Sequence, residues 1–515
     1  MNKNKYNNLL KLRINFDLLL FFIILFSSSY LVTICFYGYE NFKYSSDLFH
    51  HYSVIRNIHE GLGPYEGPKY QYMLGNHTYL IYYLISPLLY LYKDPKILLL
   101  INILAIFSAS YLIYLISKKI MGNLDKKNFI SFLIAISFLI YPTIFKGYFY
   151  PTYGFQPDTL ATPLFLCIFL FILQNRITLT IIFLLLFLSV KEEFILILPA
   201  LIIFTVIIQK LFNLGGITWN IKNSSLIIIP YILFSTLIIF ILLTAISLND
   251  SLEYLPAFWN QSAFSAEIIY ISFYKVIKIV APGLILILMI YFLSGFERKI
   301  LILILLLFFS ALLRIFENAY IYGLPDGTAW GNLILGPIHF VIFIVALRFF
   351  YENYNRNSYL LFIGFLSYLS LAMINIYTSQ LIVNNSSVID SIRFYNSKSP
   401  LIEMISETKK LDSLMVKKAE YDYFITNEFV IHPFIKMSHV SLEWLETHFL
   451  WNSKDDDLTR NNIISNASYI LIFKQKKIFF PEKKLYEDIP SKDFIKLLQA
   501  NRTIIYESDF FLLLN

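Results

Sequence analysis

Long apolar runs constrain the fold of this chain more than any other feature. Runs of about 20 mostly apolar residues, the length that a helix needs to cross a bilayer, recur between residues 17 and 380. The whole chain is 57% hydrophobic and 15% charged, whereas a soluble domain carries roughly 25% charged residues. These values exclude a disordered chain and an ordinary soluble enzyme. They predict a polytopic α-helical membrane protein.

We predict about eleven membrane-spanning helices. They cover residues 17–37, 97–116, 129–145, 159–174, 177–190, 194–211, 224–247, 269–293, 299–316, 332–349 and 357–380. The apolar segment 78–92 is short and contains Pro87, and we expect an interfacial or re-entrant helix there. With that choice the Lys and Arg residues of the loops gather on the cytoplasmic side, as the positive-inside rule requires. The N-terminus is then cytoplasmic, and a large first outer loop covers residues 38–79.

The composition changes near residue 385, which divides the chain into a multi-span membrane domain (1–384) and a tail (385–515). The tail has short apolar runs and nearly balanced numbers of basic and acidic residues. Its pattern predicts strands at 421–428, 467–473, 502–508 and 510–514, with helices at 401–411 and 493–500. We therefore expect a small C-terminal α/β domain with mixed strand directions, on the extracytoplasmic side.

The first outer loop holds the clearest candidate for acid–base chemistry. Ser46 and Asp47 precede a segment with helical periodicity that ends near Gly61. On this helix His50 and His51 lie within one turn of Asp47. Asp47 has two interpretations: a general base for a hydroxyl group, or a cap that only stabilises the helix. The histidines would orient Asp47 or bind phosphate.

Ionisable residues near two predicted spans add to this picture. Charges at membrane depth are costly unless they pair or face water, so the run Lys191-Glu192-Glu193 predicts either a polar cavity or a tight hydrated turn. Asp158 precedes another span, where it caps the helix or faces the same cavity. His339 lies in the outer half of a span and is either a core histidine or a phosphate ligand.

These residues, in this order, resemble the family of predicted membrane proteins known as domain of unknown function 2079, which is related to the GT-C class of polyprenyl-phosphate-dependent membrane glycosyltransferases. The matching segments are SSDLFHHY, GLGPY, GNHTYLIYYLISPLLYLY, YGFQPDTLATP and VKEEF, together with the apolar strands of the tail. The resemblance implies a GT-C-like fold in which Asp47, in the first outer loop, acts on the acceptor. Lys191 and Glu192 match a Lys-Glu pair of the family. The family pattern has a His where this chain has Gln156.

The combined prediction is a membrane glycosyltransferase with an outward-facing site. It would transfer a sugar from a polyprenyl-phosphate donor to a glycan, lipid or protein acceptor, with inversion and with Asp47 as the base. The other candidate substrate-binding residues are His50, His51, Arg56, His77, Gln156, Asp158, Lys191, Glu192 and His339. No cofactor is predicted, and a divalent metal with Glu192 as a ligand stays open. We expect no nucleic-acid partner. A transporter or flippase for a lipid-linked or small polar substrate is the alternative, and a noncatalytic scaffold is the third.

Overall fold

A computed structural model shows how these segments are arranged. It describes residues 15–40, 44, 46–66, 71–72, 78–124, 127–139, 154–248, 284, 287–288, 290–292, 297–317, 332–353, 407, 410–411, 413–415, 423–426, 438–441, 467–473, 502–508 and 511–514.

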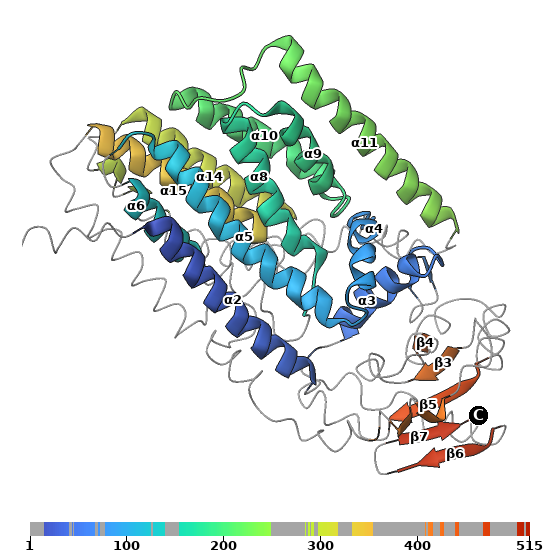
Figure 1. Cartoon of the computed structure of the whole chain (residues 1–515). Coiled ribbons are helices and arrows are strands. Elements are labelled where there is room, and N and C mark those ends of the chain that lie inside the picture. The colour runs from blue at the N-terminus through green and yellow to red at the C-terminus, as the bar shows by residue number, and fades with distance from the viewer. Residues whose placement is uncertain are drawn as a thin grey trace, which may run out of the picture.

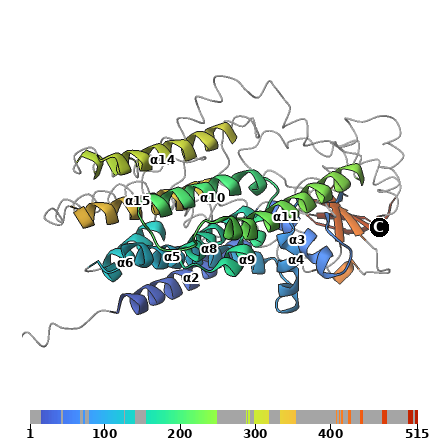
Figure 2. The same cartoon turned by 90° about the horizontal axis from the view of Figure 1, so that it is seen from above.

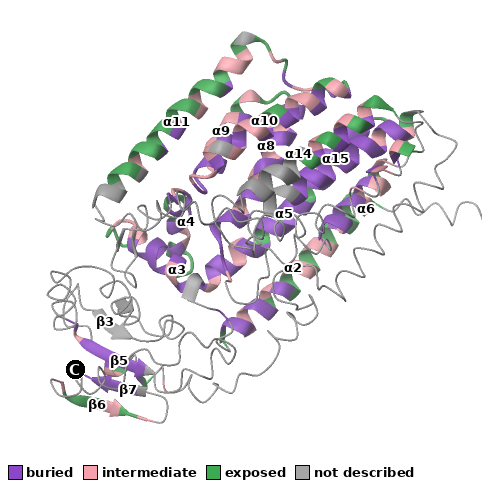
Figure 3. Ribbon diagram, turned by 180° about the vertical axis from the view of Figure 1, so that it is seen from behind, coloured by how far each residue is buried: buried purple, intermediate pink, exposed green. Residues whose placement is uncertain are grey.

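Apolar helices form a bundle around α5 (Figure 1). The helices are α2 (Phe16–Glu40), α5 (Lys96–Met121), α6 (Lys127–Leu139), α8 (Ala161–Leu173), α9 (Ile177–Leu188), α10 (Phe194–Leu211), α11 (Ile221–Leu248), α14 (Arg298–Glu317) and α15 (Asn332–Asn353). Helix α5 packs against α2, α6, α8 and α15. The most apolar stretch of α5 is 67% buried, against 22% for α2 and 17% for α11. The apolar faces that α2 and α11 turn outward (Figure 3) are suited to contact lipid.

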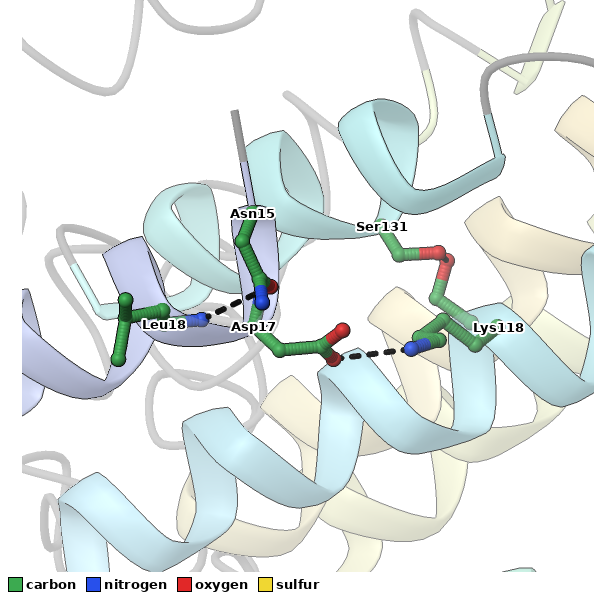
Figure 4. A network of polar contacts seen from close by, with 6 residues as sticks. Asn15, Asp17, Leu18, Lys118 and Ser131 are labelled. Carbon is green, nitrogen blue, oxygen red and sulfur yellow. Dashed lines mark hydrogen bonds and ion pairs between the residues drawn. The ribbon is translucent and has the colours of Figure 1, made fainter. Parts of the chain in front are cut away.

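Two ion pairs fix the direction of α5 relative to α2. Lys118 Nζ lies 2.9 Å from Asp17 Oδ1 at the start of α2 (Figure 4), and Lys96 Nζ lies 2.7 Å from Glu40 Oε1 at its end. The two helices are therefore antiparallel. The chain between Glu40 and Lys96 therefore leaves and re-enters the bundle at the same end, which is the arrangement expected for a segment 78–92 that does not cross.

Short elements occupy this end of the bundle. They are α3 (Ser46–His59), the antiparallel pair β1 (Tyr65–Glu66) and β2 (Gln71–Tyr72), α4 (Ile81–Ile85) and the 3-10 helix η3 (Ser86–Tyr90), which contains Pro87. Helices α4 and η3 have five residues each, so together they rise about 18 Å, well below the roughly 30 Å of the hydrocarbon core. Figure 2 shows α4 running across the direction of the bundle helices. These dimensions fit an interfacial helix.

The number of spans remains a prediction. Three described helices are long and apolar enough to cross a membrane by length and composition: Phe16–Glu40, Lys96–Met121 and Lys222–Ile241. The predicted spans 269–293 and 357–380 lie largely or wholly outside the described residues, and so does the end of the predicted span 129–145.

A five-stranded sheet from the tail lies at the same end of the bundle as α3 and α4 (Figures 1 and 2). Its order is β4-β3-β5-β7-β6, with β3 (Tyr423–Thr426), β4 (Ser438–Ser441), β5 (Tyr469–Phe473), β6 (Ile504–Glu507) and β7 (Phe511–Leu514). Strand β3 is parallel to β4 and β5, whereas β7 is antiparallel to β5 and β6. Four of the strands fall in the segments predicted above; β4 was not predicted.

Candidate functional site

Helix α3 carries several of the predicted site residues. Asp47, His50, His51 and Arg56 all belong to it, although the side chain of Asp47 lies outside the described part of the structure. His50 is half-buried, whereas His51 and Arg56 are buried. Burial raises the pKa of Tyr52 to about 12, and the positive charge of Arg56 opposes this rise. A polar helix that is buried to this extent is covered by protein rather than by water.

The imidazole of His51 connects three segments of the chain. Its Nε2 lies 3.2 Å from Gln156 Oε1, and its Nδ1 lies 2.5 Å from the hydroxyl of Tyr82 in α4. The rings of Tyr79 and Phe155 meet the imidazole edge to face, with centroids 5.9 and 5.8 Å away. We call His51, Tyr82 and Gln156 the His51 network. It joins α3 to α4 and to the segment before α8.

Gly154 explains how the segment with Gln156 comes so close to α3. Its φ is +71°, and a Cβ at this position would lie 2.8 Å from Tyr44 Cδ1 and 3.3 Å from Leu48 Cβ. Only glycine tolerates both the positive φ and this approach. The carbonyl of Gly154 also accepts a hydrogen bond from Asn102 Nδ2 in α5, at 3.2 Å. The segment is thus held between α3 and α5.

A second connection ties the start of α4 to the turn between α9 and α10. The backbone N–H of Thr78 donates to Glu192 Oε2 at 2.8 Å, and the N–H of Ile81 donates to the carbonyl of Ser189 at 2.8 Å. The predicted tight turn at 191–193 is present, but its charged side chains are buried or half-buried. The turn is therefore part of the interior of this end of the bundle.

Asp158, from the segment before α8, lies beside the three charged residues of this turn. We call these four residues the charged cluster: Asp158, Lys191, Glu192 and Glu193. Lys191 Nζ lies 3.1 Å from Glu193 Oε1 and 3.9 Å from Asp158 Oδ1, and each of these three side chains is at most 10% exposed. Burial raises the pKa of Tyr79, the charge of Lys191 opposes the rise, and the three carboxylates add to it. Tyr79 therefore lies among the charges and also touches His51. It joins the charged cluster to the His51 network.

Other predicted site residues are not part of this arrangement as described. His77 lies outside the described residues. His339 is buried in α15 and makes no hydrogen bond with either ring nitrogen within the described structure. Its neighbour Phe340 contacts Phe138, near the end of α6, at 5.1 Å between ring centroids. Within the described residues, no group of three or more His, Cys, Asp or Glu side chains could hold a metal ion.

The sequence did not point to Thr78, Tyr79 or Tyr82 as parts of the site. Tyrosines are frequent in this chain, which has 38, and a buried one cannot be told from an interfacial one by composition. Glu193 follows Lys191-Glu192 directly, but the sequence could not show that it lies beside the Lys191 ammonium. The one available signal was the glycine of YGFQPD, because glycine is the usual residue where the backbone adopts a positive φ or where another group approaches it closely.

Comparisons with known proteins agree with this architecture. The sequence profile described as "Predicted membrane protein (DUF2079)" matches residues 47–326, which includes α3, α4 and the charged cluster. Two solved structures of ArnT from Cupriavidus metallidurans have similar folds. The one bound to undecaprenyl phosphate superimposes with a TM-score of 0.52 at 8% identity, over 95% of this chain and 97% of ArnT. The apo structure gives 0.50 at 9% identity, over 96% and 97%.

Curated protein sequences give no match. At such low identity the likeness to ArnT shows a shared fold and nothing more. Because the family profile covers more than half of the sequence, this chain belongs to the DUF2079 family of predicted membrane proteins.

Proposed function

We propose that this protein transfers a sugar from a polyprenyl-phosphate-linked donor to an acceptor on the outer face of the membrane. The observation that carries the proposal is the charged cluster, which is buried at one end of a GT-C-like bundle and connected to the helix of Asp47. The ArnT structure that contains undecaprenyl phosphate supports a lipid-linked donor for a fold of this kind. A site at the end of the bundle suits such a donor, because the tail stays in lipid while the phosphate enters a polar environment.

The proposed topology follows from the same features. About eleven spans place the N-terminus in the cytoplasm, and the α/β domain of residues 385–515 on the extracytoplasmic side, next to the site. The ion pair of Glu40 with Lys96 supports this arrangement, since it keeps the first outer loop on one side.

In the proposed mechanism Asp47 is the general base. The acceptor hydroxyl gives its proton to the Asp47 carboxylate as its oxygen bonds to the anomeric carbon. The bond from that carbon to the phosphate oxygen breaks in the same displacement, the electron pair leaves on the phosphate, and the anomeric carbon is inverted. His51 lies one helical turn after Asp47, so the His51 network holds this part of α3 in place.

The remaining site residues bind substrate in this proposal. Lys191 stabilises the departing phosphate, helped by Arg56, His77 or His339. The sugar hydroxyls form hydrogen bonds with four side chains. They donate to the carboxylates of Asp158 and Glu192, and they donate to or accept from Gln156 and His50. Glu192 is also the candidate metal ligand if the reaction uses a divalent cation. The assay below tests this by comparing activity with and without a chelator.

The test is release of polyprenyl phosphate by the purified protein in lipid. A panel of radiolabelled undecaprenyl-phosphate hexoses and pentoses serves as donor, and a membrane extract supplies acceptors, with and without EDTA. We expect release by the natural chain and loss of release in D47N, with folding intact. D17N is the matched control, because Asp17 lies on α2 at the opposite end of the bundle. If no donor is consumed but a labelled lipid crosses the bilayer, the protein is a flippase. Unimpaired D47N would remove the proposed base.

A further inference from the structure

The geometry of the His51 network fixes which nitrogen of His51 carries the proton. The carbonyl oxygen of an amide can only accept, so Gln156 Oε1 requires a proton on Nε2. In the neutral imidazole Nδ1 is then an acceptor, and the Tyr82 hydroxyl must donate to it. The side chain of His51 is 5% exposed, and that of Tyr82 is 1% exposed. Both ring nitrogens thus bind other parts of the protein.

We propose that Tyr82 and His51 are positioning residues of the transferase site. Tyr82 fixes the tautomer and the plane of His51, and His51 holds the turn of α3 that bears Asp47 against Gln156. The segment with Gln156 continues directly into Asp158 of the charged cluster. This proposal rests on the proposed function. Of the two roles that the sequence left open for His51, it favours orienting the Asp47 region over binding phosphate. Neither residue touches the substrate.

Loss of the Tyr82 hydroxyl should disturb the geometry more than the packing. Phenylalanine at position 82 would keep the ring that packs on Tyr79, whose centroid lies 5.1 Å away. It would remove the hydrogen bond between the Tyr82 hydroxyl and the buried Nδ1 of His51, which is unfavourable. The imidazole would then be free to exchange tautomers or to rotate away from Gln156. A displacement of about 1 Å in a catalytic group can lower the rate about a hundredfold.

The experiment compares Y82F with Y83F in the full-length protein in lipid. Tyr83 is the adjacent residue of α4 and is 44% exposed, so Y83F controls for removal of a hydroxyl from this helix. Solid-state NMR of ¹⁵N-histidine-labelled protein reports the tautomer of His51, with H51N identifying its signal. Release of polyprenyl phosphate gives kcat and KM, and thermal unfolding checks the fold.

We expect a single Nε2–H tautomer for His51 in the natural chain and in Y83F, and a mixture in Y82F. We also expect kcat to fall about tenfold to a hundredfold in Y82F, with KM for the donor little changed. An Nδ1–H tautomer in the natural chain would overturn the tautomer assigned to His51. An unchanged kcat in Y82F, with the tautomer altered, would overturn the positioning role. If the natural chain consumes none of the donors, the proposed function fails and takes the positioning role with it. The NMR result still reports the geometry in that case, so the two failures are distinguishable.

Discussion

The backbone N–H of Thr78 donates a 2.8 Å hydrogen bond to the carboxylate of Glu192, although 114 residues separate them in the chain. This contact attaches the start of the short helix α4 to the turn that carries Lys191. Tyr79, the next residue, lies between the charged cluster and the His51 network. The two halves of the proposed site therefore depend on one short segment for their relative position.

Replacing Glu192 by alanine should loosen this segment. A hydrogen bond to a charged group contributes about 1.5–3 kcal/mol, so the Thr78 amide should exchange with deuterium at least about tenfold faster in E192A. E192Q, which keeps an oxygen acceptor, is the control and should lie between E192A and the natural chain. Hydrogen exchange followed by mass spectrometry measures both. Equal protection of Thr78 in E192A would contradict this role of Glu192.

Lys191 should be essential for stability because its partners are buried. K191M would leave the carboxylates of Asp158 and Glu193 without this cation, at a cost of about 3–5 kcal/mol. The double variant K191M/E193Q should recover part of the loss. Lys93 pairs with Glu60 at the surface with 54% of its side chain exposed, so K93M should cost at most about 1 kcal/mol. Denaturant unfolding in mild detergent compares the four proteins; equal losses in K191M and K93M would refute the argument.

Gly154→Ala should displace the segment of Gln156 from α3. The new methyl group would lie 2.8 Å from Tyr44 Cδ1, at a backbone φ of +71° that alanine disfavours. Gly63 is the matched control, because its φ is +80° and a Cβ there meets nothing within 4 Å. We expect G63A to lose about 1 kcal/mol from backbone strain alone and G154A to lose more, together with most of its transferase activity. Similar losses in both variants would mean that the close approach to Tyr44 is unimportant.

Asp94 should give a pH-dependent contribution to stability. Its Oδ1 accepts a hydrogen bond from the backbone N–H of Lys96 at 2.8 Å. Burial raises the pKa of Asp94 above the usual 3.8, whereas this hydrogen bond and the charge of Lys96 lower it. A raised pKa in the folded state means that the folded protein holds the proton more tightly than the unfolded chain. The stabilising contribution of Asp94 to folding is therefore present below about pH 3.8, and it is lost as the pH rises through the pKa of Asp94 in the folded state.

D94N keeps the acceptor oxygen but cannot ionise. Its thermal stability relative to the natural chain should therefore increase between pH 3.5 and pH 7, whereas D94A should be less stable by about 1 kcal/mol near neutral pH. The opposite result would be an advantage of D94N over the natural chain that becomes smaller as the pH rises. It would show that burial is not the main influence on the pKa of Asp94.

Cysteine labelling tests the proposed topology. Leu62, after α3, is 44% exposed, and Asn123, after α5, is exposed at the other end of the bundle. In a chain whose Cys35 and Cys167 are replaced by serine, L62C should react with an impermeant maleimide in intact cells, and N123C should react only after permeabilisation. Labelling of both from the outside would refute the orientation.

The helical bundle was predictable because a membrane helix has a strong local signature. Helices α5, α10 and α14 begin and end within about five residues of the predicted spans, since about 20 apolar residues and flanking charges define each end. The prediction that segment 78–92 does not cross rested on charge placement, and the short helices α4 and η3 fit it. Strand β4, with the sequence SHVS, has too few apolar residues to show a strand pattern.

The candidate site was only partly predictable. Sequence position placed His51 one turn after Asp47, where it would orient Asp47 or bind phosphate, but it could not show that the two ring nitrogens contact Tyr82 and Gln156. The pairing of Lys191 with Glu193 and the bond of Glu192 to Thr78 depend on the conformation of a tight turn. Contacts across 105 or 114 residues are set by the packing of α3, α4 and α8, and no local pattern encodes them.

The two ion pairs between α2 and α5 also set the depth of the site. Asp17 and Glu40 are 23 helical steps apart, which corresponds to about 35 Å, slightly more than the roughly 30 Å of the hydrocarbon core. A helix of this length that crosses the bilayer would place the two pairs among the lipid headgroups of opposite leaflets. Helix α3 follows Glu40 after a few residues, so it begins at headgroup level. The phosphate of a long-chain lipid donor would reach it by lateral diffusion, without being lifted out of its leaflet.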